Sequence, residues 1–284
     1  MRLIKHSTSE EFIEMNEKFL IQKESFHNLK LGLVYGIKAK TIIDTAPLYY
    51  SIVDGEQSSG CAVRSNNDRP LTISEMSKAA VDLLISDLIK NNVVLEGIVG
   101  EENTATYFKD QWIKLNPVEF KINLHLGVYE CLNIILPRID SEEIISAEIE
   151  HTEIVKIFMK GFGEDCFPDK PFTEENLEAL LKRHLGTKSL YLLKNINGDL
   201  VSMAANTRST LKGGTISLVY TPPKYRGKGY GSKMVALLSK KIMENGKSFT
   251  NLFTDLSNPT SNSIYQKVGY VKIGQNIHFD FKQI

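Results

Sequence analysis

Hydrophobic positions in the carboxyl-terminal half of the chain follow two periods in turn. Some segments repeat apolar residues every three to four positions, as on one helix face, and others are short apolar runs typical of strands. Strand, helix and strand in sequence predict a right-handed crossover, so we expect an α/β fold with a twisted mixed sheet flanked by helices. The pattern predicts helices at 150–161, 173–186, 232–244 and 258–269, and strands at 190–194, 200–207, 215–221, 249–254 and 277–281.

The amino-terminal half repeats this order more faintly. Asp54-Gly55 separates two strand-like runs, as Asn197-Gly198 does in the second half, and both dipeptides suit tight hairpin turns. The repeat predicts two tandem domains, residues 1–140 and 141–284. The expected elements of the first are strands at 48–53, 60–64, 71–73, 93–99 and 120–135, and helices at 75–90 and 103–115.

Composition places the chain among ordinary globular proteins. Hydrophobic residues make up 42% of its 284 residues, and 34 basic side chains balance 34 acidic ones. A net charge of zero provides no overall field to attract nucleic acid. Without a signal-like apolar start or an apolar run long enough for a membrane span, we expect a cytoplasmic protein with neither membrane nor nucleic-acid partners.

Cysteine and histidine spacing argues against a metal site. Cys61, Cys131 and Cys166 are odd in number and far apart, so we expect reduced, mostly buried thiols rather than disulfides or zinc ligands. The six histidines contain no pair at the helical spacing of a metalloprotease motif. We therefore expect no metal.

The segment from Val219 to Ser232 carries the clearest chemistry. An apolar run ends at Pro222-Pro223, and alternating glycines, Gly227, Gly229 and Gly231, then open a helix. Glycines let a backbone approach a ligand closely, and the first amides of a helix lack partners and attract anions. The segment therefore predicts a cradle for a diphosphate, beside which Arg226 and Lys228 bring positive charge.

The glycine spacing of this segment matches two other phosphate-binding motifs less well. A P-loop requires Gly-Lys-Ser/Thr, whereas Lys228 is followed by Gly229. A dinucleotide fingerprint wants glycines at its first, third and sixth positions, and here they stand at the first, third and fifth. Asp255, about where a ribose-binding acid would stand, keeps a nicotinamide cofactor as the minor alternative.

Arg226, Gly229 and Gly231 also match the Arg/Gln-x-x-Gly-x-Gly/Ala signature, so the segment resembles the coenzyme A site of the GNAT superfamily of N-acetyltransferases. A second family motif, Asn-x-x-Ala-x-x-Leu-Tyr-x-Lys-x-Gly-Phe, resembles Asn258 to Tyr270. The resemblance covers roughly residues 146–284. It implies acetyl-coenzyme A as cosubstrate and direct transfer of an acetyl group to a primary amine of a small molecule or peptide.

Tyr265 is the candidate general acid. Asn258 and Tyr265 are seven residues apart, about two helical turns, so both are expected to project toward one ligand. A tyrosine with a pKa near ~10 is protonated at neutral pH and can donate to a leaving thiolate. The expected coenzyme-binding residues are Val219, Tyr220, Thr221, Arg226, Gly227, Lys228, Gly229, Tyr230, Gly231, Ser232, Asn258 and Asn262.

Pro222 and Pro223 cannot continue a ladder, so the strand at 215–221 is expected to separate from its parallel neighbour. Pantetheine amides could then pair with its end, and one backbone N–H could polarise the thioester carbonyl. A general base is less evident. The available acids are Asp255 and, in a loop predicted at 162–172, Glu164 and Asp165, where Cys166 is expected to be structural.

The first half lacks the functional glycines. Ser74-Glu75-Met76-Ser77-Lys78 stands where the cradle would be, with acids instead of donors, so we expect a degenerate partner domain. The tandem arrangement also resembles Fem-type aminoacyl transferases and mycothiol synthase, which remain alternatives beside a non-catalytic coenzyme A sensor. Neutral charge and the intact cradle favour coenzyme A over aminoacyl-tRNA. The chain is expected to act as a monomer or homodimer.

Overall fold

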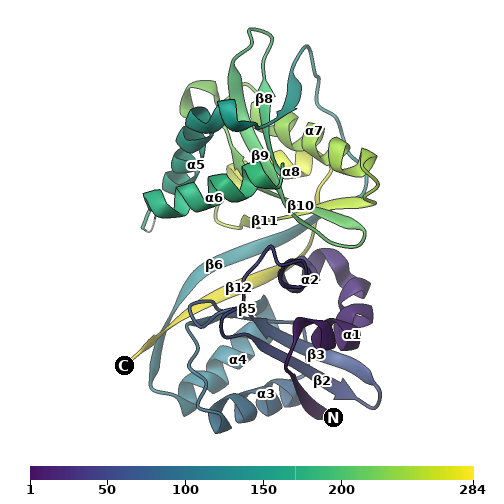
Figure 1. The fold of residues 1–284 in the computed structure, drawn as a ribbon, viewed down its shortest axis with the longest axis vertical. Coiled ribbons are helices and arrows are strands. Elements are labelled where there is room, and N and C mark those ends of the chain that lie inside the picture. Colours follow the sequence, from purple (N-terminus) through teal and green to yellow (C-terminus); the bar gives the residue numbers. More distant parts are fainter. Residues whose placement is uncertain (170) are drawn as a thin grey trace. The chain divides into compact units, whose positions relative to one another are not determined.

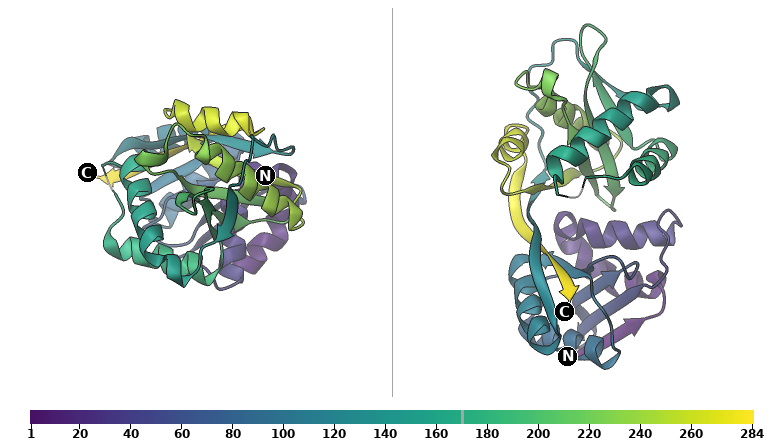
Figure 2. Two further views of the ribbon diagram at one scale, coloured as in Figure 1. Left: turned by 90° about the horizontal axis from the view of Figure 1, so that it is seen from above. Right: turned by 90° about the vertical axis from the view of Figure 1, so that its left-hand side faces the viewer.

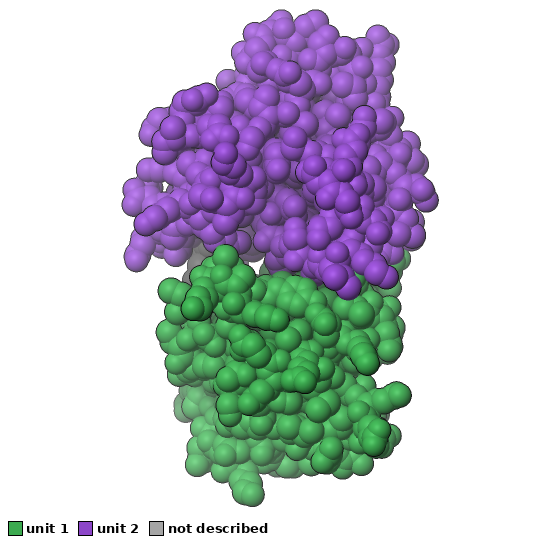
Figure 3. Space-filling view, turned by 45° about the vertical axis from the view of Figure 1, so that its right-hand side comes forward, with its two compact units in different colours: residues 1–128, 254–257, 272–284 green, residues 129–253, 258–271 purple. Residues whose placement is uncertain are grey.

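The computed structural model describes residues 1–169 and 171–284; Lys170, in the predicted loop at 162–172, lies outside the described residues. The chain forms two compact units, coloured separately in Figure 3. The first contains residues 1–128, 254–257 and 272–284, and the second contains 129–253 and 258–271. This division differs from the expected boundary at 140/141, because 129–140 belong to the second unit and the last strand belongs to the first.

One order of elements occurs twice along the chain: a strand, two helices, three strands, a helix, a strand, a helix and a strand (Figure 1). The first copy consists of β1 (Arg2–His6), α1 (Ser9–Leu20), α2 (Glu24–Lys38), β2 (Leu48–Asp54), β3 (Gln57–Arg64), β4 (Leu71–Ile73), α3 (Lys78–Lys90), β5 (Gly97–Glu101), α4 (Glu102–Leu115) and β6 (Val118–Cys131). The second consists of β7 (Glu143–Ser146), α5 (Thr152–Cys166), α6 (Glu174–Gly186), β8 (Leu190–Lys194), β9 (Leu200–Ser209), β10 (Gly213–Tyr220), α7 (Tyr230–Glu244), β11 (Phe249–Asp255), α8 (Pro259–Lys267) and β12 (Val271–Gln283).

The first unit has helices on both faces of a sheet whose strand order is β1-β2-β3-β4-β5-β12-β6. Neighbouring residues of β2 point to opposite faces, as the pleat of a strand requires. Tyr49 packs with α1 and α2 in one core, and Tyr50 packs with α3 and α4 in the other. The last strand completes this unit, since β12 pairs antiparallel with β5 from Asn276↔Glu101 to Asp280↔Gly97.

The second unit follows the same plan, with helices on both faces of its sheet (Figure 2). Its strand order is β11-β10-β9-β8-β7. Leu193 faces a core formed with α7 and α8, whereas Leu192 faces a core formed with α5 and α6. One face of α7 packs on the sheet, because Met234, Leu238 and Ile242 are all buried. Strands β10 and β11 are parallel, as the crossover requires. The predicted fold class, a mixed α/β sheet flanked by helices, is confirmed.

Short-range sequence patterns predicted several helix starts and hairpin turns correctly. Thr173 caps α6 by accepting from the Asn176 amide, and Asn258 caps α8 by accepting from the Ser261 amide. Gly55 and Gly198 have φ angles of 64° and 85° in the two hairpin turns. These helix starts and hairpins therefore follow from sequence alone.

Other predictions were wrong. Residues 162–166 continue α5 rather than forming a loop, and Gly161 and Gly163 lie close to the side chains of Tyr220 and Phe172. Strand β5 begins at Gly97 rather than Val93. Four elements, β1, α1, α2 and β7, were not predicted. On the two helices, buried polar residues such as Asn16 and Lys30 obscure the apolar faces.

No helix within the described residues combines the length and apolar character needed to cross a membrane.

Candidate active site

The turn between β10 and α7 has the backbone of an anion cradle. A short 3₁₀ turn, Pro223–Tyr225, follows the strand, and Gly227 and Gly229 then have φ angles of 75° and 80°. Gly229 is the N-cap of α7 and provides no side chain to cap the helix. A Cβ atom added at either glycine would have no atom within 4 Å. The left-handed conformation requires glycine here, and the space above the turn is open.

The amides of this turn are available as donors. The first hydrogen bond of α7 runs from the Lys233 amide to the Gly229 carbonyl, at 3.0 Å. Within the described residues, the amides from Gly227 to Ser232 donate to no backbone carbonyl. The positive end of the helix dipole adds to this array of donors. The turn can therefore hold an anionic group such as a diphosphate.

Strand β10 separates from β11, as expected from the two prolines. The two strands pair only from Gly213↔Phe249 to Thr215↔Asn251. On its other side, β10 has a bulge against β9 between Ser217 and Tyr220, where Leu218 has a φ of 53°. A bulky residue at positive φ is strained, and such strain concentrates at functional sites. The end of β10 is thus free on the β11 side to pair with an extended ligand.

The two nearest cations differ in their partners. Arg226 forms an ion pair with Asp165 of α5, and its Nε donates to the Thr221 carbonyl at 2.9 Å. The Arg226 charge is therefore already paired, and Asp165 is engaged rather than available as a base. Lys228 lies over the Tyr225 ring at 6.0 Å and forms no ion pair with any described residue. Lys228 is the cation that remains for a ligand.

Lys233, in the first turn of α7, is also neutralised. Its Nζ lies 2.5 Å from Glu142 and 3.7 Å from Asp140, and its side chain is only 13% exposed. Desolvation by burial would raise the pKa of the Glu142 carboxyl, but hydrogen bonds from Lys233 and from the amides of 140–142 outweigh it and lower the pKa to about 2. This pair holds the segment before β7 against the start of α7.

Helix α8 brings Tyr265 into the second unit's core. Tyr265 is 8% exposed, and burial together with the nearby Cys166 thiol raises the pKa of its phenol. Its ring packs edge-on against Tyr270, with ring centroids 6.1 Å apart. The Tyr270 hydroxyl in turn lies 2.8 Å from both Ser239 and Thr250. Tyr265 therefore keeps its proton over the whole physiological range.

The structure shows what several other candidate side chains contact. Asn258 uses its side chain to cap α8, with Oδ1 3.0 Å from the Ser261 amide, so it does not project beside Tyr265. The Tyr220 side chain is buried against Gly161 of α5, so only its backbone could meet a ligand. Cys166 is exposed rather than buried. Asp255 accepts from the Ser257 amide at 2.8 Å, as a turn-capping acid does.

Comparisons with known proteins agree with this geometry. A family model described as "FR47-like protein" matches residues 195–279. The N-alpha-acetyltransferase MAK3 of Arabidopsis thaliana is 29% identical over 82 residues, which cover 29% of this chain and 43% of MAK3. The match therefore spans less than half of that relative. An acetyltransferase of the GNAT family from Colwellia psychrerythraea superposes with a TM-score of 0.58 at 14% identity, over 99% of this chain and 100% of the other.

Over residues 195–279 the chain is therefore similar to N-acetyltransferases, and its fold is that of GNAT proteins. A tandem GNAT protein from the clavulanic acid biosynthesis pathway is similar over 98% of both chains, with a TM-score of 0.57 and 8% identity. At such identities, the likeness to solved structures shows the fold alone. The family match at 195–279 contains both GNAT motifs, the cradle and helix α8.

Sequence reasoning missed two features of this candidate site. No sequence pattern predicts the left-handed conformation of Leu218, because leucine is an ordinary strand residue and the bulge arises from pairing with β9. The Arg226–Asp165 ion pair joins residues 61 positions apart, and the wrongly predicted loop concealed that Asp165 stands on a helix.

Proposed function

We propose that the chain is an acetyl-coenzyme A dependent N-acetyltransferase that transfers the acetyl group directly to a primary amine of a small molecule or peptide. The uncapped start of α7, with Gly227 and Gly229 in the left-handed conformation, is the observation that carries the proposal. The residues fit the coenzyme, because amides without backbone acceptors suit its diphosphate and the separated end of β10 suits its pantetheine arm.

In this proposal, the amides from Gly227 to Ser232 bind the diphosphate and Lys228 neutralises part of its charge. The backbone from Val219 to Thr221 pairs with the pantetheine amides. Arg226 holds the turn in place through Asp165 and the Thr221 carbonyl. Asn258 and Asn262 contribute through helix α8, whose start they stabilise, since the Asn262 amide group donates to the Asn258 carbonyl. The coenzyme supplies an activated acetyl thioester when bound.

Tyr265 then acts as the general acid. Direct transfer forms a bond between the amine nitrogen and the acetyl carbon and breaks the bond from that carbon to sulfur, so the leaving thiolate needs a proton. The phenol can provide it because its raised pKa keeps it protonated at neutral pH. A backbone N–H beside the Leu218 bulge would stabilise negative charge on the carbonyl oxygen.

The second copy of the repeat, within residues 141–284, carries this site, and the first copy, within 1–140, supplies a scaffold. In the first copy, Ser77 caps α3, since its side chain accepts from the Ala80 amide. The position equivalent to the cradle is therefore already capped. We infer a tandem GNAT protein with one coenzyme site.

Thermal unfolding with and without acetyl-coenzyme A tests the proposal. We expect stabilisation by millimolar acetyl-coenzyme A, because a ligand that binds only the folded state raises the free energy of unfolding. An absence of stabilisation would refute coenzyme binding. A panel of amines, amino acids and peptides, assayed by release of the coenzyme thiol, then identifies the acceptor; release without any acetylated amine would contradict direct transfer.

A further inference from the structure

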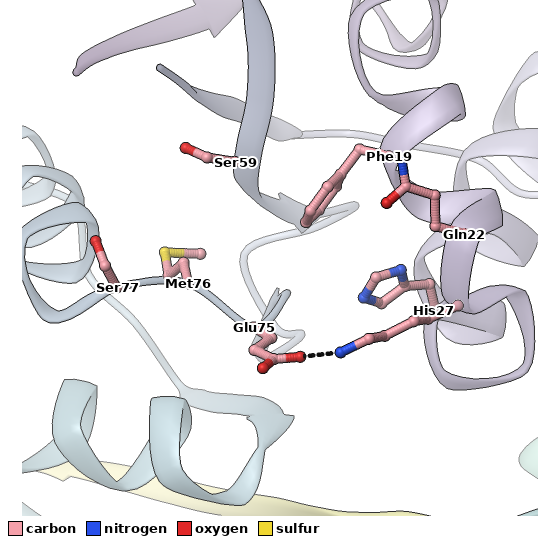
Figure 4. A pocket seen from close by; sticks show the side chains of 8 residues that line it. Phe19, Gln22, His27, Ser59, Glu75, Met76 and Ser77 are labelled. Atoms are coloured by element: carbon pink, nitrogen blue, oxygen red, sulfur yellow. Dashed lines mark hydrogen bonds and ion pairs between the residues drawn. The ribbon is translucent and has the colours of Figure 1, made fainter.

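The first unit contains a cavity that the proposed reaction does not use. It encloses about 700 Å³ and is lined by residues from α1, from the 3₁₀ turn at 21–23, from α2, from β3 and from the segment before α3 (Figure 4). A volume of this size is typical of small-molecule sites. All of its lining residues belong to the first unit.

His27 presents a buried hydrogen-bond acceptor to this cavity. The side chain is 2% exposed, and its Nδ1 lies 3.0 Å from the Leu20 carbonyl oxygen, so Nδ1 donates and Nε2 keeps a lone pair. Nε2 is buried and has no hydrogen-bond partner among the described residues. Burial, aided by the charge of Lys30, lowers the pKa of the imidazole to about 3, so the ring stays neutral. An acceptor left in this state costs free energy until a donor reaches it.

An ion pair stands beside His27 in Figure 4. Lys23 Nζ and Glu75 Oε2 are 2.6 Å apart, and the two side chains are 60% and 54% exposed. Exposed pairs of this kind contribute little to stability, so a ligand can separate them at little cost. Phe19, whose ring centroid is 5.5 Å from that of His27, and Met76 supply apolar surface.

We propose that this cavity binds a small zwitterion of the α-amino-acid type with an apolar side chain. The ligand's ammonium group donates to His27 Nε2 and to Glu75, its carboxylate accepts from Lys23, and its side chain packs against Phe19 and Met76. A simple cation or anion would engage one member of the ion pair and leave the other without its counter-charge. A zwitterion replaces both partners at once, and its ammonium protons also satisfy the buried acceptor.

Titration calorimetry of the full chain, without acetyl-coenzyme A, tests this site independently of the proposed function. The probes are L-phenylalanine, 2-phenylethylamine, which lacks the carboxylate, and 3-phenylpropionate, which lacks the ammonium. We expect L-phenylalanine to bind and each of the other two to bind at least about 10-fold more weakly. No binding of L-phenylalanine, or equal binding of any two probes, would overturn the proposal.

Variants then locate the binding. Lys23→Met and Glu75→Gln alter exposed side chains, so the fold should persist, and each should weaken L-phenylalanine binding by about 10-fold. Lys240→Met and Glu244→Gln remove a matched exposed pair on α7 and should leave the affinity unchanged. His27→Phe should also weaken binding, with circular dichroism to verify folding. Unchanged affinity in both Lys23→Met and Glu75→Gln would refute the assignment.

Discussion

Helices α3 and α7 occupy the same place in the two copies of the repeat, after the third of three consecutive strands, yet they begin differently. Helix α3 follows Glu75 and is capped by Ser77, whose side chain accepts from the Ala80 amide at 3.3 Å. Helix α7 begins at Gly229, which has a φ of 80° and no side-chain cap. The start of α3 satisfies one of its amides through Ser77, whereas the start of α7 offers its amides to a ligand.

The difference shows how a single fold separates structural from binding roles. The first amides of every helix need partners, and a serine side chain supplies one within the chain. Glycine supplies none but opens space for an anion. Before α3 stands the acid Glu75, which is paired with Lys23, whereas before α7 stands the cation Lys228, which can bind an anion. The comparison therefore predicts that only the start of α7 binds coenzyme.

The largest expected effect comes from Gly229→Glu. The side chain would enter the open space above the turn, and its charge would repel the diphosphate, so we expect the affinity for acetyl-coenzyme A to fall on the order of 100-fold or more in calorimetry. Gly246→Glu is the matched control, since Gly246 has a φ of 91° and open space but lies beyond the other end of α7. Equal loss of affinity in both variants would show that strain, not the cradle, is responsible.

Tyr265→Phe should lower kcat by about 100-fold or more, because general acid catalysis typically contributes that factor. Since burial raises the pKa of the phenol, the loss should be the same at every pH from 6.5 to 8.5. Tyr270→Phe is the control, because that hydroxyl serves only Ser239 and Thr250; it should cost about 1 kcal/mol of stability and leave kcat nearly unchanged. Unchanged kcat in Tyr265→Phe would refute the acid role.

Glu142→Gln tests the support that α7 receives and α3 lacks. Because the folded-state pKa of Glu142 is lowered to about 2, from an ordinary 4.5, its stabilisation is present above pH 4.5 and is lost as the pH falls toward 2. We expect the variant to melt about 2–4 °C lower at pH 7, with the difference from the natural chain shrinking between pH 4.5 and 2. A difference independent of pH would contradict the ion pair with Lys233.

The smallest effect is expected from Ser77→Ala, which removes the cap of α3. Loss of an N-cap should lower the free energy of unfolding by about 1 kcal/mol in urea denaturation. The affinity for acetyl-coenzyme A should not change, because the first unit is proposed to hold no coenzyme site. A change in affinity without loss of stability would contradict the proposed difference between α3 and α7 and would indicate that the start of α3 also binds the coenzyme.

Residues close together in sequence account for what could be predicted. The hairpin turns at Gly55 and Gly198, the caps at Thr173 and Asn258 and the buried stripe of α7 all depend on spacings of a few residues. Longer-range features were not accessible. Arg226 meets Asp165 across 61 positions, and residues 272–284 belong to the first unit although they follow the second copy of the repeat.

Sequence by itself determined most of the elements, their repetition and the glycines of the cradle, because backbone conformation and helix capping are local properties. Tertiary structure decided which charges remain available, since Arg226 and Lys233 lose theirs to acids from other elements while Lys228 keeps its own. It also decided the bend of β10 at Leu218 and the burial of Tyr265, which raises the pKa of its phenol further. Pairing and desolvation depend on neighbours that only the folded chain brings together.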